Sequence, residues 1–195
     1  MIPIIDYRTI PQREIPLIIS CNQENITGEA IDFSTGLPNV PPCCHSMNSI
    51  DQGEFVSQSP GGYNEIPMRL YMVPKTQLIF VELVNCNSEF IAAFRASVLG
   101  KLNGPPWRKA YNWLQIVGQA VHLPWLSWPG IDDCSQDTIF HLKVAAPKLP
   151  PADNEIIQAI GNNSNPEEFL AYQLNFPGVF NAKYFYDSNN GGIIV

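Results

Sequence analysis

The sequence predicts an α+β domain, and its segment order carries that prediction. Short apolar or alternating runs separated by turn residues fill positions 15–84, as expected for strands. Apolar residues at helical spacing dominate from Ser88 onward. Strand-like segments followed by helix-like segments are typical of α+β proteins. The chain has 195 residues, 45% of them hydrophobic and 15% charged, which suits one domain with a buried core.

The expected strands are short apolar runs bounded by turn signals. The run at 15–20 predicts a buried strand, and the segment at 25–33 predicts a short helix. A proline-rich loop then precedes a strand at 43–50, and Asp51-Gln52-Gly53 marks a turn into a strand at 54–59. Two more strands are expected at 68–72 and 78–84. The last is rich in β-branched and aromatic residues, which predicts a central strand.

The expected helices follow in the second half. Phe90, Phe94 and Val98 lie near helical spacing in the segment 88–102, which Gly104-Pro105-Pro106 ends. A second helix is expected at 111–121, and a third from Cys134 until Pro147. Weaker patterns predict helices at 152–160 and 166–174. We expect a single domain over residues 1–195, with 147–195 a helical and irregular C-terminal extension.

Charge and cysteine usage exclude several classes of protein. The formal net charge is −7 and the 11 Lys and Arg residues are scattered, which argues against nucleic-acid binding. No apolar run approaches the roughly 20 residues of a membrane-spanning helix, so we expect no integral membrane segment. The first 20 residues lack a signal-peptide pattern, which predicts a cytoplasmic location in the producing cell. Five cysteines without C-x-x-C spacing favour reduced thiols over a disulfide framework.

The stretch 130–142 places one cysteine on the first turn of a helix. Asp132 or Asp133 is a suitable N-cap, because its carboxylate can accept free backbone N–H groups there. The helix dipole would lower the pKa of the Cys134 thiol, whereas the neighbouring carboxylates would raise it. A catalytic role for Cys134 therefore requires a base.

The chain has three histidines to compare as candidates for that base. His141 lies seven residues beyond Cys134 on the same helix, about 10 Å along the axis, and is excluded. His122, at the end of a predicted helix, suits interaction with the helix dipole. His45 lies on a predicted strand, which can face a helix N-terminus at hydrogen-bond distance. A purely structural role for His45 also fits the pattern.

Five sequence blocks in the span 15–146 carry a resemblance to a known family. Each has the order and approximate spacing of that family's motifs: Ile26 to Gly36; Cys44-His45-Ser46-Met47; Val56 to Gly62; the strand at 78–84 with Tyr111-Asn112-Trp113; and Cys134-Ser135-Gln136. On these blocks the chain resembles the circularly permuted NlpC-type papain-like hydrolases, the YiiX-like group. Gln58 and Asn112 stand where the family has carboxylates, Cys44 where it has Ser, and Gln136 where it has Glu.

This resemblance implies a fold, a mechanism and a set of site residues. The implied fold is an antiparallel sheet or small barrel with the His strand first, packed against helices that carry the Cys, and its catalytic core spans 15–146. Cys134 would be the nucleophile, His45 the general base and Gln58 the residue that orients His45, without a cofactor or metal. The reaction would cleave an amide (peptide or peptidoglycan-type) or ester bond in a peptide, cell-wall or acyl-bearing substrate through an acyl-enzyme. Aromatic residues near the cysteine helix would line the substrate groove: Tyr111, Trp113 and Trp128.

Three other interpretations stay open at this stage. The four departures suit a non-catalytic binding or virion structural module on the same fold. A thiol acyltransferase acting on lipid would share the thioester step. A zinc site built from Cys43, Cys44 and His45 with Cys21 or Cys86 is disfavoured, because neighbouring strand residues point to opposite faces.

Overall fold

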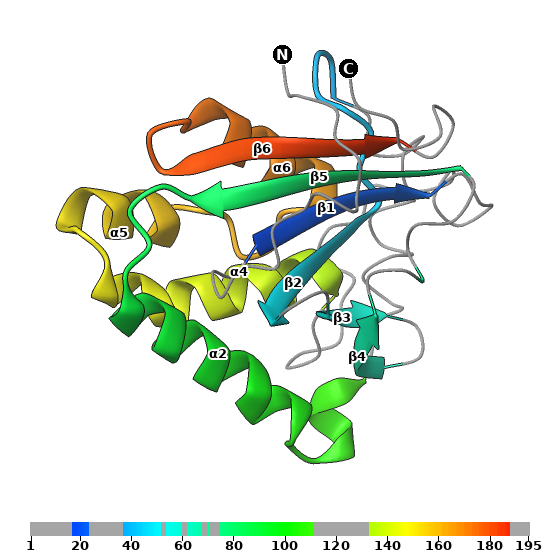
Figure 1. Ribbon diagram of the computed structural model, residues 1–195, viewed down its shortest axis with the longest axis vertical. Coiled ribbons are helices and arrows are strands. Elements are labelled where there is room, and N and C mark those ends of the chain that lie inside the picture. Colours follow the sequence, from blue (N-terminus) through cyan, green and yellow to red (C-terminus); the bar gives the residue numbers. More distant parts are fainter. Residues whose placement is uncertain are drawn as a thin grey trace.

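The computed structural model describes residues 17–23, 37–51, 54–59, 62–67, 70, 75–110 and 133–187. These residues form an α+β structure around one antiparallel sheet with the strand order β4-β3-β2-β1-β5-β6 (Figure 1). The α+β prediction is therefore confirmed. The strands are β1 (Leu17–Gln23), β2 (His45–Asp51), β3 (Glu54–Ser59), β4 (Gly62–Pro67), β5 (Thr76–Leu83) and β6 (Phe180–Asp187).

Four α-helices lie in the described part of the chain: α2 (Ser88–Leu102), α4 (Cys134–Ala145), α5 (Pro151–Gln158) and α6 (Pro166–Asn175). Short 3₁₀ helices follow α2 and α4, at Pro106–Lys109 and Ala146–Lys148. In Figure 1, α2 and α4 lie together on one side of the sheet, and α4 packs against β2 and β3.

Most predicted elements occur within a few residues of the expected positions. The bounds predicted for β3 and α2 match the structure, and β1, β2, β5 and the three helices after residue 133 are shifted by a few residues. The helices expected at 25–33 and 111–121, and all but residue 70 of the strand expected at 68–72, lie outside the described residues.

Two strands, β4 and β6, were not predicted. Gly62 suggested the end of a strand, whereas it begins β4 with a φ of 102°, a conformation that glycine adopts without strain. The aromatic tail at 180–187 forms β6 and pairs along β5, from Gln77–Asp187 to Leu83–Phe180. The predicted C-terminal extension thus contributes a strand to the main sheet.

A single hydrophobic core fills the space between the sheet and its helices. Strand residues Ile18, Val56, Ile79 and Val81 pack there with helix residues such as Phe90, Phe94, Ile139, Leu142 and Phe169. Alternate residues on the other face of the sheet, including Ile19, Met47, Phe55 and Phe80, are also buried. Burial of a large apolar side chain contributes about 1.5–3 kcal/mol, so this packing fixes which face of each strand meets α4.

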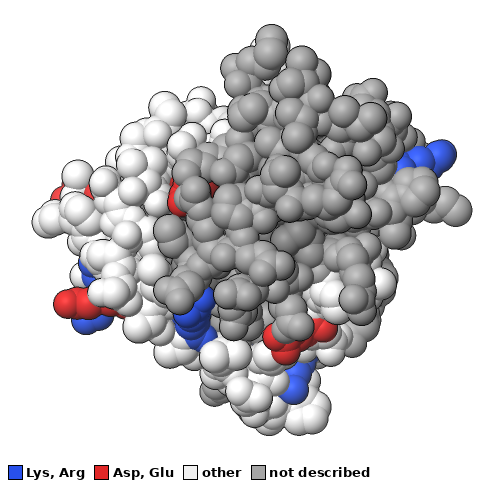
Figure 2. Space-filling model, viewed as in Figure 1, with Lys and Arg blue, Asp and Glu red and all other residues white. Residues whose placement is uncertain are grey.

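On the face shown in Figure 2, the Lys, Arg, Asp and Glu side chains of the described residues are scattered. Among the helices of the described residues, none is both long and apolar enough to cross a membrane.

Candidate active site

The helix α4 begins at Cys134 and is closed by a capping box. The Asp133 carboxylate accepts the Gln136 backbone N–H at 2.8 Å, and the Gln136 side chain accepts the Asp133 N–H at 3.2 Å. The predicted N-cap is therefore confirmed for Asp133, while Asp132 lies outside the described residues. The box fixes the point at which the chain enters α4 and hence the position of the Cys134 thiol.

The Cys134 thiol points into the protein and is 1% exposed. Its sulfur accepts a hydrogen bond from the backbone N–H of Ser46 on β2. The β2–β3 ladder runs from Asp51–Glu54 to Asn48–Val56, so Ser46 lies beyond its last pair. Burial, together with the Asp133 charge, raises the pKa of Cys134 well above its usual value, against the opposing effect of the Ser46 N–H. The thiol is therefore neutral at neutral pH.

His45 is the first residue of β2 and is partly buried. Its Nε2 atom lies within hydrogen-bond distance of the Ser57 hydroxyl on β3. Burial lowers the pKa of His45 to about 4, and the Asp137 carboxylate partly opposes that shift. The imidazole is therefore neutral at pH 7 and able to accept a proton.

The Cys134 thiol and the His45 imidazole lie on opposite faces of the sheet at the start of β2. His45 is in register with Cys21, and its contact Ser57 alternates with Val56, so both point away from the core that α4 covers. Ser46 has the opposite orientation and contacts Cys134. The structure thus brings the Cys134 sulfur to the main chain of Ser46, next to His45 in the sequence. The thiol contacts Ser46, whereas the imidazole contacts Ser57. Their action as a catalytic pair stays a prediction.

The predicted third residue, Gln58, makes other contacts. Its amide donates to the carbonyl oxygens of Lys109 at 2.9 Å and Ala110 at 2.8 Å, and these bonds hold the segment after α2 against β3. The residue next to it, Ser57, contacts the His45 imidazole. The predicted substrate-binding residues Tyr111, Trp113 and Trp128 lie outside the described residues, as does His122.

A buried polar network beside the thiol was not predicted from the sequence. His141, excluded above as the base, is fully buried and contacts the Ser97 hydroxyl at 2.7 Å, the Tyr63 hydroxyl at 3.0 Å and Asp137 Oδ1 at 3.1 Å. Lys101 reaches the same Asp137 oxygen at 2.8 Å. Burial alone would raise the pKa of Asp137, but His141 and Lys101 together hold it below its usual value. The network joins α2, α4 and β4 and places a carboxylate one helical turn after Cys134.

Polar side chains also cover the strands beneath α4. Ser20, Ser46, Asn48 and Gln58 are buried, and each carries at least one hydrogen-bonding atom that has no partner among the described residues. Ser20 and Ser46 are in register on β1 and β2, and Ser46 lies next to the thiol. A buried polar atom without a partner costs about 1–3 kcal/mol, so this polar layer is less favourable for folding than apolar packing would be.

The other cysteines form no disulfide with Cys134 or with one another. Cys43 and Cys44 lie close enough to Cys134 to influence its pKa, and the Cys44 thiol donates to the Cys21 carbonyl at 3.5 Å. Among the described residues, no group of three or more His, Cys, Asp or Glu side chains is arranged to hold a metal ion.

Comparison with known proteins adds no relative on which to test these roles. No protein-family model matches the chain, and no curated protein matches its sequence. The candidate site therefore rests on the five sequence blocks and on the geometry of Cys134, Ser46 and His45.

Proposed function

We propose that the protein is a thiol hydrolase of papain-like type that cleaves an amide or ester bond through a Cys134 acyl-enzyme. One observation carries the proposal: a capped helix delivers the Cys134 sulfur to the backbone of Ser46, the residue next to His45. A nucleophile at a helix N-terminus beside a strand that bears a histidine is the arrangement that Cys–His hydrolases require.

The reaction begins from a neutral thiol and a neutral imidazole. His45 contacts Ser57 on the face of the sheet that points away from α4, so catalysis requires its side chain to leave Ser57 and reach the sulfur around the start of β2. There it would take the thiol proton as the sulfur attacks the substrate carbonyl. The negative charge of Asp137 favours the resulting imidazolium. The backbone N–H of Cys134, at the start of α4, would donate to the developing oxyanion. His45 then protonates the leaving amine or alcohol, and a water activated by the same imidazole hydrolyses the thioester to a carboxylic acid and free thiol.

The proposed mechanism requires a substrate with a reactive carbonyl group. Peptide, peptidoglycan-type and acyl-bearing substrates all present the carbonyl that this mechanism needs. The polar layer of Ser20, Ser46 and Asn48 supports a substrate with hydrogen-bonding groups next to the reactive carbonyl. A lipid-directed acyltransferase would use the same thioester and pass the acyl group to an alcohol or amine instead of water.

A second function, a non-catalytic binding module on the same fold, is favoured by one specific observation. Burial shifts both candidate groups away from activation, because it raises the pKa of Cys134 and lowers the pKa of His45. A module that does not transfer acyl groups needs no thiolate, so its thiol would behave like any buried cysteine.

Trapping of the acyl-enzyme distinguishes these two functions. The protein is mixed with p-nitrophenyl acetate, and peptide mass spectrometry follows acetylation of each cysteine over time. We expect selective acetylation of Cys134 and a decrease of about 10²-fold or more in its rate for His45→Ala, the usual contribution of a general base.

Two matched variants make the result specific. Cys86→Ala removes the half-buried thiol that follows β5, and Ser57→Ala frees His45 from its present contact. We expect Cys134 to be acetylated at the parent rate in Cys86→Ala. In Ser57→Ala we still expect selective acetylation of Cys134. Slow and equal acetylation of all five cysteines, unaffected by His45→Ala, would contradict the hydrolase proposal. The non-catalytic binding module would then be the better explanation.

A further inference from the structure

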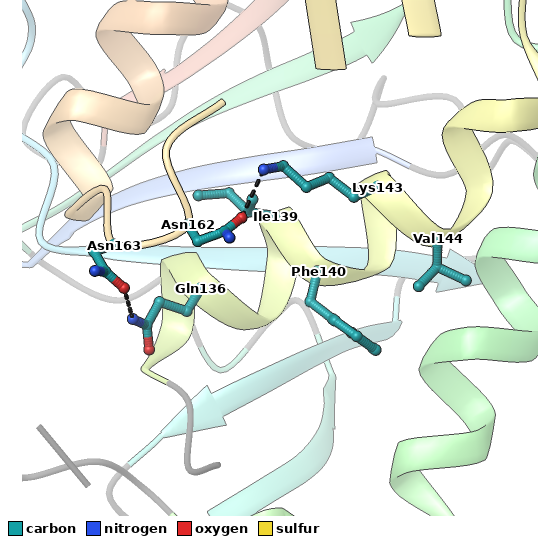
Figure 3. Close-up of a pocket in the computed structure, with 7 residues that line it drawn as sticks. All are labelled: Gln136, Ile139, Phe140, Lys143, Val144, Asn162 and Asn163. Atoms are coloured by element: carbon teal, nitrogen blue, oxygen red, sulfur yellow. Dashed lines mark hydrogen bonds between the residues drawn. The ribbon is translucent and has the colours of Figure 1, made fainter. Parts of the chain in front are cut away.

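The outer face of α4 carries a pocket of about 490 Å³ that is separate from the thiol site (Figure 3). Its volume is in the range of small-molecule sites in proteins. The lining residues come from α4 and from the loop between α5 and α6: Gln136, Ile139, Phe140, Lys143, Val144, Asn162 and Asn163. Cys134, Thr138 and His141 occupy the opposite, buried face of the same helix.

One wall of the pocket is apolar although it is open to solvent. Phe140 is 53% exposed and Val144 is 48% exposed, and both project from α4 in Figure 3. They are two of the few large apolar side chains that the described residues leave exposed, and they lie one helical turn apart beside the buried Ile139. This wall suits an aliphatic side chain.

The other wall is formed by polar residues of α4 and of the 159–165 loop, and hydrogen bonds hold this loop against the helix. The Lys143 ammonium donates to the Ile160 carbonyl at 2.5 Å and to Asn162 Oδ1 at 2.6 Å. Gln136 donates to Asn163 Oδ1 at 3.1 Å, and its own oxygen accepts the Asp133 N–H. Ser135 adds a bond to the Ser164 carbonyl at 2.7 Å. The loop and the helix therefore form one preorganised surface.

These bonds occupy one lone pair of each amide oxygen and leave several N–H donors for a ligand. Each of the three amide oxygens, on Gln136, Asn162 and Asn163, already accepts a hydrogen bond. The Lys143 ammonium has used two of its three N–H groups, both on uncharged oxygens. The terminal amide N–H₂ groups of Asn162 and Asn163 remain at the rim. The remaining N–H groups of Lys143, Asn162 and Asn163 favour a ligand that brings acceptors, and a negative charge beside Lys143 is favoured most.

We propose that this pocket binds a carboxylate borne by an apolar residue, as at the free carboxyl terminus of a peptide that ends in a leucine-like side chain. The carboxylate would pair with Lys143, the aliphatic side chain would lie on Phe140 and Val144, and preceding carbonyl groups would accept from Asn162 and Asn163. The pocket is an anchor and not a catalytic site, and the inference does not depend on the chemistry of Cys134.

NMR titration of the full chain tests this site with defined probes. The probes are N-acetyl-L-leucine, its uncharged analogue N-acetyl-L-leucinamide, and the peptides acetyl-Ala-Ala-Leu with a free or an amidated carboxyl terminus. Amide shifts along α4 and in the 159–165 loop report binding. We expect the free acids to bind about tenfold or more tightly than their amides, which corresponds to one charge-assisted contact of about 1.4 kcal/mol.

Matched variants separate the pocket from general effects. Lys143→Met keeps the apolar stem and removes the charge, and Lys148→Met removes a charge from an exposed position after α4. We expect Lys143→Met to abolish the preference for the acid and Lys148→Met to leave it unchanged. Phe140→Ala should weaken all four probes, and Leu99→Ala, at an exposed position on α2, should not.

The peptide arm identifies the source of the carboxylate. Tighter binding of the free-acid peptide than of N-acetyl-L-leucine indicates a polypeptide terminus, and equal affinity indicates a small free acid. Equal binding of acids and amides, or no shift up to the solubility of the probes, would overturn the proposal. The thiol experiment has a separate readout at Cys134, so failure of one leaves the other intact.

Discussion

His45 couples the stability of the protein to pH through a single residue. Its pKa is about 4 in the folded chain, whereas an unfolded histidine titrates near 6.5. The folded state binds this proton less readily, so its contribution to stability is complete above about pH 6.5 and is lost as pH falls toward 4. We expect the urea midpoint of the parent to fall between pH 7 and pH 5.

The variant His45→Gln gives the matched control for this pH effect. Glutamine is uncharged throughout the range and retains hydrogen-bonding groups for Ser57. Its urea midpoint should therefore fall less than that of the parent between the same two pH values. Parallel pH profiles for the two proteins would show that the neutral imidazole is not required in the fold.

At the scale of residues, the sequence predicted which side chains belong to the candidate site, but it predicted less well which of them are in contact. Cys134 and His45 came from residue type and order, and the structure places both near Ser46. The contact of His45 with Ser57 rather than Gln58 depends on strand alternation, which requires the pairing register. The pair Asp137 and His141, spaced i, i+4, was visible in the sequence, but its partners Lys101 and Tyr63 lie on other elements.

The start of α4 is the element whose geometry most affects the site, and Asp133 sets it. Asp133→Ala removes the cap, which we expect to lower the free energy of unfolding by about 1 kcal/mol. The same change removes a negative charge that raises the pKa of Cys134, so alkylation of that thiol should become faster at a given pH. Urea denaturation and the rate of iodoacetamide labelling measure the two effects.

The helix α6 offers a control of the same type. Asn165 caps it with the same reciprocal bonds to Glu168, at 2.8 and 3.0 Å, and is not among the residues that influence the thiol. Asn165→Ala should destabilise the protein by a similar amount and leave Cys134 labelling at the parent rate. Equal acceleration in both variants would mean that local unfolding, and not charge, exposes the thiol.

Helices were predicted more closely than strands, and the reason is physical. The segments that form α2, α4 and α6 carry local signals, namely helical spacing and capping residues such as Asn87, Asp133 and Asn165. A strand is completed by partners that are distant in sequence. β6 is recognisable only through β5, about 100 residues earlier, and Gly62 gives a turn signal although it begins β4.

For the whole molecule, the segment after residue 146 packs into the same hydrophobic core as α2, α4 and the strands. Phe169, Leu170 and Phe180 belong to the hydrophobic cluster of α2, α4 and the strands. The Asn85 amide after β5 donates to Asp153 on α5 at 2.9 Å, and the Leu37 N–H donates to Glu167 on α6 at 2.9 Å. The distinction between a core at 15–146 and an extension at 147–195, drawn from the resemblance, therefore does not correspond to a break in packing.

Deletion of residues 147–195 follows as the test of this integration. The deletion removes β6 and leaves β5 at the edge of the sheet, and it also uncovers the buried face that Ile157, Phe169 and Leu170 fill. Three such side chains account for roughly 5–9 kcal/mol of burial, which is comparable with the entire stability of a typical domain. We expect the shortened chain to lose cooperative thermal unfolding by circular dichroism and to expose all of its cysteines to alkylation.

A variant that keeps the fold distinguishes the effect of losing the hydrophobic core from the effect of losing the contacts of the 159–165 loop. Asn162→Ala together with Asn163→Ala removes two exposed amides without touching the cluster, so it should unfold cooperatively near the parent temperature. If the deleted chain instead melts cooperatively and labels Cys134 as the parent does, the residues up to 146 fold on their own. The C-terminal segment would then be a cover on a complete domain, contrary to the packing of β6 and α6.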